Sequence, residues 1–242
     1  MSKTHSASDN ELAPLAANDL RSELAIVEQE LLSALADLRP PFSRLVASEL
    51  KRMAPLVRGA VVLAAGVTVP DTDELKAQRI YLGAAVEMLH LALGIHTRLL
   101  PSPASSQEID RSILGSAILA GDFCFSRAAG LAVRTNSATV VDVFAQALQR
   151  VSEGHLRHSF TPAARPYDEN RELFASGISA AGALAGYTPA ALGVALAIGV
   201  QVADALRDAD PTLLHLPAHG ADVLAPAQRA RWQALFAWLL AR

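Results

Sequence analysis

The sequence predicts an all-α fold, and two observations support this prediction. Apolar residues recur at intervals of three and four, as the buried face of a helix requires, and the period of two that is typical of strands is never sustained. Alanine and other small residues fill the apolar segments, and they let helices pack closely around a central cavity or at a subunit interface. The first apolar series consists of Leu20, Leu24, Val27, Leu31, Leu35 and Leu38.

The first two expected helices are bounded by caps and breakers. One begins after Asn18 or Asp19, whose side chains can accept a hydrogen bond from the first turn, and ends at Pro40-Pro41. The next runs to about Gly66, because glycine commonly follows the last turn of a helix.

The later helices follow from similar signals. Asp71 and Glu74 have the spacing of a capping box in which aspartate replaces serine or threonine, and they predict a long helix that ends by Leu100, before Pro101. Further helices are expected at residues 107–133, 137–155, 168–185, 189–208 and 226–240. The linkers are short and the sequence has no tandem repeat, which indicates one domain.

Composition narrows the class of protein. The chain of 242 residues is 51% hydrophobic, so it can bury one core, which we expect at residues 18–242 behind a disordered tail at residues 1–17. The net charge of −3 gives no electrostatic reason to expect nucleic acid as a partner. The N-terminal segment lacks the apolar region of a secretory signal, and the only cysteine, Cys124, cannot form an intrachain disulfide. We therefore expect a cytoplasmic protein.

One uncharged run raises the question of a membrane span. It extends from Leu173 to Ala203, and a spanning helix needs about 20 apolar residues. Gly186 and Tyr187 interrupt the run, and Thr188 followed by Pro189 has the pattern of an N-cap and a first helical position. Two buried helices are thus favoured over a membrane hairpin, and no membrane span is expected.

The histidines give only weak signals of a metal site. His155 with His158, and His215 with His219, have the spacing of ligands on one helix, but neither pair has a convincing third ligand. Surface or capping histidines are the favoured interpretation. The sequence also has no phosphate-binding glycine loop and no nucleophile elbow.

Two segments carry a resemblance to a known family. They read GAAVEMLHLALGIH at residues 83–96 and LAGDFCFSRA at residues 119–128, and they resemble the trans-isoprenyl diphosphate synthases (polyprenyl synthetases). The resemblance implies an isoprenoid synthase-type helical bundle around a central cavity, here shortened at its C-terminus. In the family the first helix runs into the motif D-D-x-x-D, whose carboxylates hold magnesium against an allylic diphosphate. Residues 97–101 of this chain read TRLLP instead.

The resemblance also implies a set of residual site residues. Lys51 and His96 match family positions that face the diphosphate of isopentenyl diphosphate, and Arg111 is the one counterpart of an arginine pair that follows the first acidic motif. Gln201, Asp204 and Asp208 match the second acidic motif, F-Q-x-x-D-D-x-x-D, whose middle aspartate is Ala205 here. Family residues that contact diphosphate as lysine and threonine fall near Glu169-Asn170, with opposite charge at the lysine position.

These substitutions predict weakened metal chemistry. Four of the six family aspartates are absent, and Mg²⁺ wants about six oxygen ligands. Asp204 and Asp208 lie at i and i+4 and could hold one ion weakly, so Mg²⁺ is possible but doubtful. Arg98 stands where a carboxylate is expected, and it either holds a diphosphate directly or pairs with Asp204 or Asp208.

Three functions are compatible with this pattern. The leading hypothesis is a catalytically inactive or impaired synthase-like protein that binds isoprenoid diphosphate or acts as a regulatory or structural subunit, as a homodimer or as a heterodimer with an active prenyl synthase. The second is a prenyltransferase that condenses isopentenyl diphosphate with an allylic diphosphate at a reduced metal site. The third is a protein that binds an isoprenoid or another lipid in its cavity.

Overall fold

The structure is a computed structural model that describes residues 6–53, 56–97, 111–160 and 167–242, and within them it contains helices and no strand. The all-α prediction is therefore confirmed. The long helices are α1 (Ser6–Ala34), α2 (Phe42–Arg52), α3 (Val57–Ala65), α4 (Asp73–Thr97), α5 (Arg111–Val133), α6 (Ala138–Phe160), α7 (Glu169–Leu184), α8 (Pro189–Asp208) and α9 (Pro226–Leu240). Two short 3₁₀ turns, η1 (Pro211–Leu213) and η2 (Ala221–Val223), connect α8 to α9.

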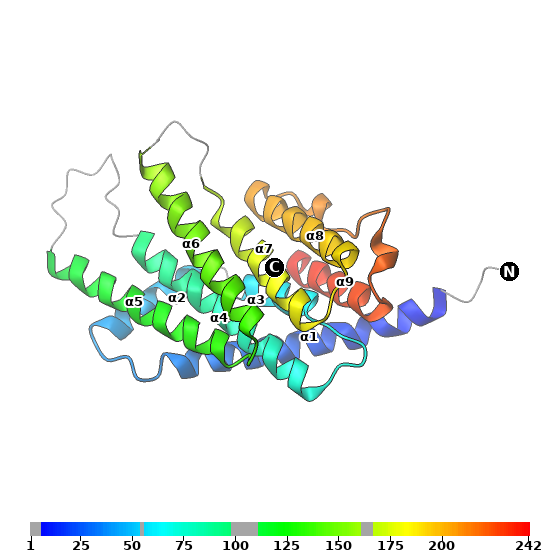
Figure 1. Ribbon diagram of the computed structural model, residues 1–242, viewed down its shortest axis with the longest axis horizontal. Coiled ribbons are helices and arrows are strands. Elements are labelled where there is room, and N and C mark those ends of the chain that lie inside the picture. Colours follow the sequence, from blue (N-terminus) through cyan, green and yellow to red (C-terminus); the bar gives the residue numbers. More distant parts are fainter. Residues whose placement is uncertain (1–5, 54–55, 98–110, 161–166) are drawn as a thin grey trace.

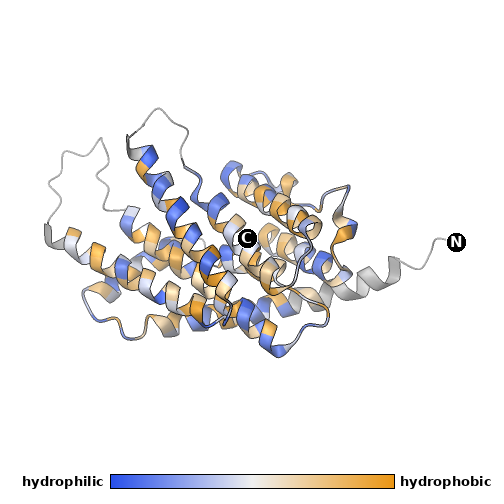
Figure 2. Cartoon of the chain, viewed as in Figure 1, coloured by the Kyte–Doolittle hydropathy of each residue, from blue (hydrophilic) through white to orange (hydrophobic). Residues whose placement is uncertain are grey.

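Helix α4 lies at the centre of the bundle. It packs against α1, α3, α5 and α7, while α9 packs along α1 and α8 lies against α7 (Figure 1). Every residue of α3 is buried, and the largest side chains of the core include Trp232 of α9 and Phe174 of α7. Hydrophilic residues gather on the outer turns of α6, whereas the middle of the molecule is largely apolar (Figure 2).

The N-terminal half differs from the sequence prediction at three places. Helix α1 begins at Ser6 rather than after Asn18 or Asp19, and it takes in residues 6–17 of the segment expected to be a disordered tail. Glutamate, leucine and alanine favour helix, which agrees with the longer α1. The expected second helix is divided into α2 and α3, and the division coincides with Pro55, which has no backbone N–H to donate.

The third difference concerns the start of α4. Thr72, not Asp71, is the cap, because its hydroxyl accepts a hydrogen bond from the backbone N–H of Leu75 at 3.2 Å. Asp71 instead pairs with the buried guanidinium of Arg79. A carboxylate is stabilised more by charge-assisted hydrogen bonds to a buried guanidinium than by the partial positive charge at the start of a helix.

The long uncharged run is divided as predicted. Helix α7 ends at Leu184, Gly186 adopts a left-handed conformation with φ of 64°, and the Thr188 hydroxyl accepts a hydrogen bond from the N–H of Ala191 at 3.2 Å. By length and composition, three helical stretches could still cross a membrane: α4, α8 and Leu114–Val133 of α5. In α4, 72% of the apolar window is buried within the protein, and in each of the other two stretches 39% of the window is buried. The absence of a membrane span stays a prediction.

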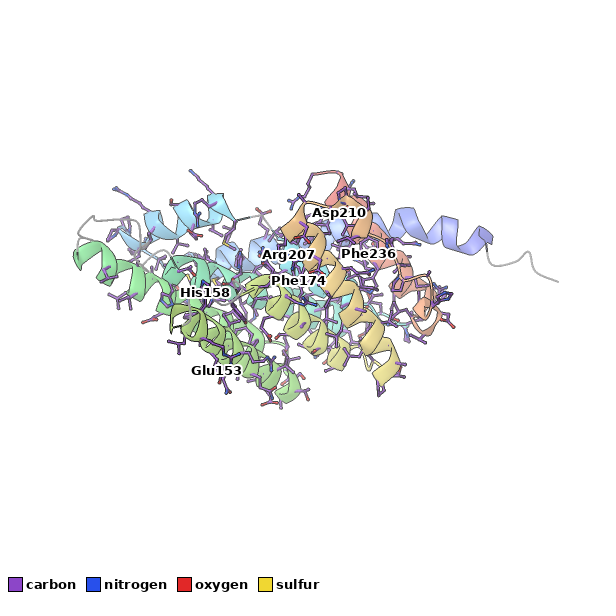
Figure 3. The ribbon with its side chains drawn as sticks, turned by 90° about the horizontal axis from the view of Figure 1, so that it is seen from above. Glu153, His158, Phe174, Arg207, Asp210 and Phe236 are labelled. Atoms are coloured by element: carbon purple, nitrogen blue, oxygen red, sulfur yellow. The ribbon has the colours of Figure 1, made fainter. Side chains whose placement is uncertain are left out.

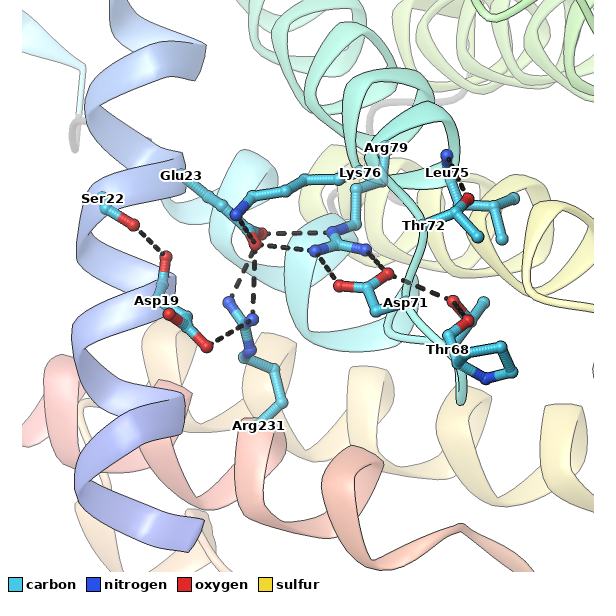
Figure 4. A network of polar contacts seen from close by, with 11 residues as sticks. Asp19, Ser22, Glu23, Thr68, Asp71, Thr72, Leu75, Lys76, Arg79 and Arg231 are labelled. Atoms are coloured by element: carbon cyan, nitrogen blue, oxygen red, sulfur yellow. Dashed lines mark hydrogen bonds and ion pairs between the residues drawn. The ribbon is translucent and has the colours of Figure 1, made fainter.

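A buried ionic cluster joins three helices (Figure 4). Glu23 of α1 accepts hydrogen bonds from Arg79 of α4 at 2.6 and 3.1 Å and from Arg231 of α9 at 3.3 and 3.4 Å. Burial alone would raise the pKa of Asp71, but hydrogen bonds from Arg79 lower it. Burial likewise opposes the charge of Arg79, whose pKa is nonetheless raised by Asp71 and Glu23. The cluster thus fixes α9 against α1 and α4.

Candidate functional site

The structure places the predicted site residues that it describes on helices α2, α4, α5 and α8. Lys51 lies exposed on α2, His96 lies in the last turn of α4, and Gln201 lies half-buried on α8. Arg98 falls outside the described residues. Arg111 is the first residue of α5, and its side chain is also outside the part that the structure describes.

His96 faces α5. Its Nε2 lies 3.2 Å from the carbonyl oxygen of Ile118 and 3.5 Å from a carboxylate oxygen of Asp122, and its ring centroid is 5.0 Å from that of Phe125. Gly121 leaves room for the His96 ring, because a Cβ at residue 121 would overlap the imidazole. His96 therefore joins α4 to α5.

The acidic residues of α8 surround an arginine. Arg207 lies at the C-terminal end of that helix (Figure 3), and its guanidinium contacts three carboxylates. Its nitrogens lie 2.8 Å from an oxygen of Asp204, 2.8 Å from one of Asp208 and 3.3 Å from one of Asp168, the N-cap of α7. Hydrogen bonding to Asp208 and then Asp204 raises the pKa of Arg207 above its ordinary value. The second acidic motif thus carries its own cation.

Two histidines hold the carboxylate of Glu169 at the start of α7. His90 Nδ1 of α4 lies 2.7 Å from one oxygen, and His155 Nε2 of α6 lies 3.2 Å from the other. Burial by itself would raise the pKa of Glu169, but the hydrogen bonds and charge of these histidines lower it to about 2. His155 is thus a partner of a carboxylate across two helices and not a simple surface histidine.

The sequence contains a partial signal for this bridge. A negative charge where the resemblance implies a lysine requires different neighbours, and His90 lies in the segment quoted at residues 83–96. The neighbouring Asn170 accepts a short hydrogen bond from Arg58 of α3, and burial lowers the pKa of Arg58. Glu169 and Asn170 at the N-terminus of α7 are therefore both engaged by side chains of other helices.

A pocket of about 340 Å³ opens between α2, α4 and the start of α7. Neither Lys51 nor His96 lines it. Arg52 is the guanidinium on its wall, and it already donates to Glu49 at 2.8 Å. Because the pocket carries Glu49 and Glu169, its charge does not favour a diphosphate. It is lined by Glu49, Arg52, Met53, His90, Gly94, Thr97 and Glu169.

One apolar space deeper in the bundle is small. A cavity of about 10 Å³ lies between α4, α6 and α7, with Leu89, Phe144 and Leu173 among its lining residues. Roughly 10–15 Å³ is needed to hold one water molecule. The predicted central cavity is therefore nearly filled by side chains at this place.

The described residues do not fit a Mg²⁺ site. Within the parts of the chain that the structure describes, no group of three His, Cys, Asp or Glu side chains could hold a metal ion. Mg²⁺ requires oxygen ligands in near-octahedral geometry. The carboxylates of Asp204 and Asp208 instead contact the guanidinium of Arg207. The two carboxylates predicted to hold an ion weakly are thus already paired.

Comparisons with known proteins show what this fold resembles. The structure is similar to a geranylgeranyl pyrophosphate synthase from Lactobacillus brevis, with a TM-score of 0.64, 18% identity and coverage of 92% of this chain and 83% of that one. A decaprenyl diphosphate synthase from Rhodobacter capsulatus gives a TM-score of 0.63, 19% identity and coverage of 92% and 78%. A polyprenyl synthase from Caulobacter crescentus complexed with calcium and isoprenyl diphosphate gives a TM-score of 0.63 and 22% identity, with coverage of 86% of this chain and 66% of that one. No family model and no curated protein matches the sequence.

Proposed function

We propose that this chain, which has a trans-isoprenyl diphosphate synthase-like fold, does not itself catalyse prenyl transfer and acts in the cytoplasm as a structural or regulatory subunit beside an active prenyl synthase. The observation that carries this proposal is the pairing of Arg207 with Asp204 and Asp208. A site that neutralises its own carboxylates has no remaining role for a metal ion.

The chemistry of the reaction supports the same conclusion. Ionisation of an allylic diphosphate needs the negative charge that develops on the leaving group to be neutralised, and metal ions commonly supply this. The pocket at the start of α7 offers Arg52, which Glu49 already engages, and two carboxylates that would repel a diphosphate. The described residues therefore provide little stabilisation for such a leaving group.

The outer surface of α5 supports a role in association. Leu119 and Val133 are 59% and 61% exposed, and Ile118 is 43% exposed. A Cβ at Gly115 or Gly130 would meet nothing within 4 Å, so a partner helix could approach closely there. A second copy of this chain or an active synthase would bury this apolar face.

A labelled prenyl-transfer assay tests the proposal. The purified chain receives isopentenyl diphosphate, Mg²⁺ and dimethylallyl, geranyl or farnesyl diphosphate, next to an active control synthase. We expect no product from the chain alone and a changed product length when it is mixed with the control synthase.

The variant Asp204→Ala separates the alternatives. Product that forms with the natural chain and disappears in this variant would contradict the proposal and favour a prenyltransferase with a reduced metal site. An unchanged product distribution in the mixture would contradict the regulatory role. Isoprenoid lipid that co-purifies with the chain would instead favour a lipid-binding protein.

A further inference from the structure

A pocket with polar walls lies between α1, the loop that joins α3 to α4, and α9. Its volume is about 240 Å³, and its lining residues differ from those of the pocket at the start of α7. Pockets that hold drug-sized ligands measure about 300–1,000 Å³, so this one fits a smaller molecule. The polar side chains on its wall are Asp19, Thr68, Asp71 and Arg231, and small apolar side chains such as Ala227 complete it.

Contacts behind the pocket hold its walls in place. Asp71 accepts a hydrogen bond from the buried Arg79 at 2.6 Å. The side-chain amide of Gln228 on α9 donates to the backbone carbonyl of Val67 at 3.0 Å. The walls are therefore formed before any ligand arrives, and a formed site lowers the entropic cost of binding.

Arg231 is weakly paired for a buried cation. Its side chain is only 5% exposed, and its nitrogens lie 3.3 and 3.4 Å from the carboxylate of Glu23. Arg79 holds the same carboxylate at 2.6 and 3.1 Å. Hydrogen bonds between a guanidinium and a carboxylate normally measure about 2.7–2.9 Å. Because a guanidinium has several N–H donors, Arg231 can also donate to an oxygen atom inside the pocket.

The carboxylate of Asp19 stands beside this guanidinium (Figure 4). One of its oxygens lies 4.0 Å from Nη2 of Arg231, which is too long for a hydrogen bond, and the side chain is 59% exposed. The pocket thus presents a negative and a positive group side by side. A simple anion would be repelled by Asp19 and Asp71, and a simple cation would be repelled by Arg231.

We infer that this pocket binds a free α-amino acid, whose carboxylate accepts hydrogen bonds from Arg231 and whose ammonium group donates to Asp19. In an α-amino acid one carbon atom joins the two charged groups, so they lie side by side as the two groups of the pocket do. The small apolar side chains of the wall leave room for an apolar side chain. Because the ligand contacts α1 and α9 together, its binding also stabilises the fold.

Titration calorimetry and thermal unfolding test the inference, with L-valine, L-leucine and L-methionine as probes. Two analogues of leucine each keep one charged group: N-acetyl-L-leucine lacks the ammonium group and L-leucinamide lacks the carboxylate. We expect at least one of the amino acids, with L-leucine as the reference, to bind and to raise Tm as its concentration rises. Both analogues should bind about tenfold more weakly or worse, because a hydrogen bond to a charged group is lost.

Two pairs of variants locate the site. Asp19→Asn removes the partner of the ammonium group, and Glu28→Gln, which changes another exposed carboxylate of α1, is its control. Ala227→Leu fills the pocket, and Ala237→Leu adds the same side chain at an exposed position of α9 that does not line it. Asp19→Asn should weaken binding about tenfold and Ala227→Leu should abolish it, whereas both controls should bind as the natural chain does.

Three outcomes would overturn the inference. The first is that none of the three amino acids binds to the natural chain. The second is that the two leucine analogues bind as tightly as L-leucine. The third is that Asp19→Asn and Ala227→Leu bind like their controls. The inference does not rest on the proposed function, because binding decides the one and prenyl transfer decides the other.

Discussion

The charge of Glu23 should contribute strongly to stability. In Glu23→Gln the shape of the side chain is kept, but Arg79 and Arg231 lose their shared carboxylate. The exposed fractions of Glu23, Arg79 and Arg231 are 0%, 0% and 4%, so solvent cannot replace the lost partner. Removal of one member of a buried ion pair costs about 3–5 kcal/mol. For a chain of this size each kcal/mol lowers Tm by about 2–4 °C, which gives a loss of roughly 6–20 °C.

Urea and thermal unfolding followed by circular dichroism measure this effect. The matched control is Glu30→Gln, because Glu30 pairs with Arg134 at 2.6 Å on the surface of the same α1 helix, where their side chains are 23% and 48% exposed. Surface pairs contribute about 0–1 kcal/mol. If Glu23→Gln lost no more free energy of unfolding than Glu30→Gln, burial of the cluster would not govern its contribution, and the reasoning would be refuted.

Three further predictions concern the site. The Glu169 carboxylate has a pKa of about 2 in the folded chain and about 4.3 in the unfolded chain. It therefore stabilises the fold above about pH 4, and this stabilisation is lost as the pH falls towards 2. Acid unfolding of Glu169→Gln should lack that loss, and an acid profile equal to that of the natural chain would refute the assignment. Gly121→Ala should displace the His96 ring at a cost of about 1–3 kcal/mol, visible in denaturant unfolding, and the added change His96→Ala should recover part of it; no recovery would place the strain elsewhere. Asp168→Ala should cost about 0.5–2 kcal/mol through the loss of the N-cap, and equal stability of Asp168→Asn and Asp168→Ala would argue against a capping role.

The sequence predicted most helix ends because their signals are local. Thr188 and Pro189 define the start of α8 through contacts with residues only a few positions away. The division near Pro55 was missed because a proline can either kink or end a helix. The assignment of Asp71 as a cap failed since its actual partner, Arg79, becomes buried only when α1 and α9 cover it.

The site was harder to predict because its contacts are distant in sequence. His90 and Glu169 are 79 residues apart, and no periodicity relates them. The quoted acidic motif located Asp204 and Asp208 on one helix face, but the Arg207 fork also depends on Asp168, 39 residues earlier. A motif can assign residue types to a helix, while the tertiary fold decides which charges neutralise which.

The ionic cluster of Glu23 also sets an order of events during synthesis. Arg231 follows Glu23 by 208 residues, so at about 5–20 residues per second it is added roughly 10–40 s later. Until then Glu23 has Arg79 but not its second arginine, and the face of α1 that α9 will cover is open to solvent and to other chains. Chaperones that shield apolar surface should therefore act on this protein mainly in the interval before α9 has left the ribosome.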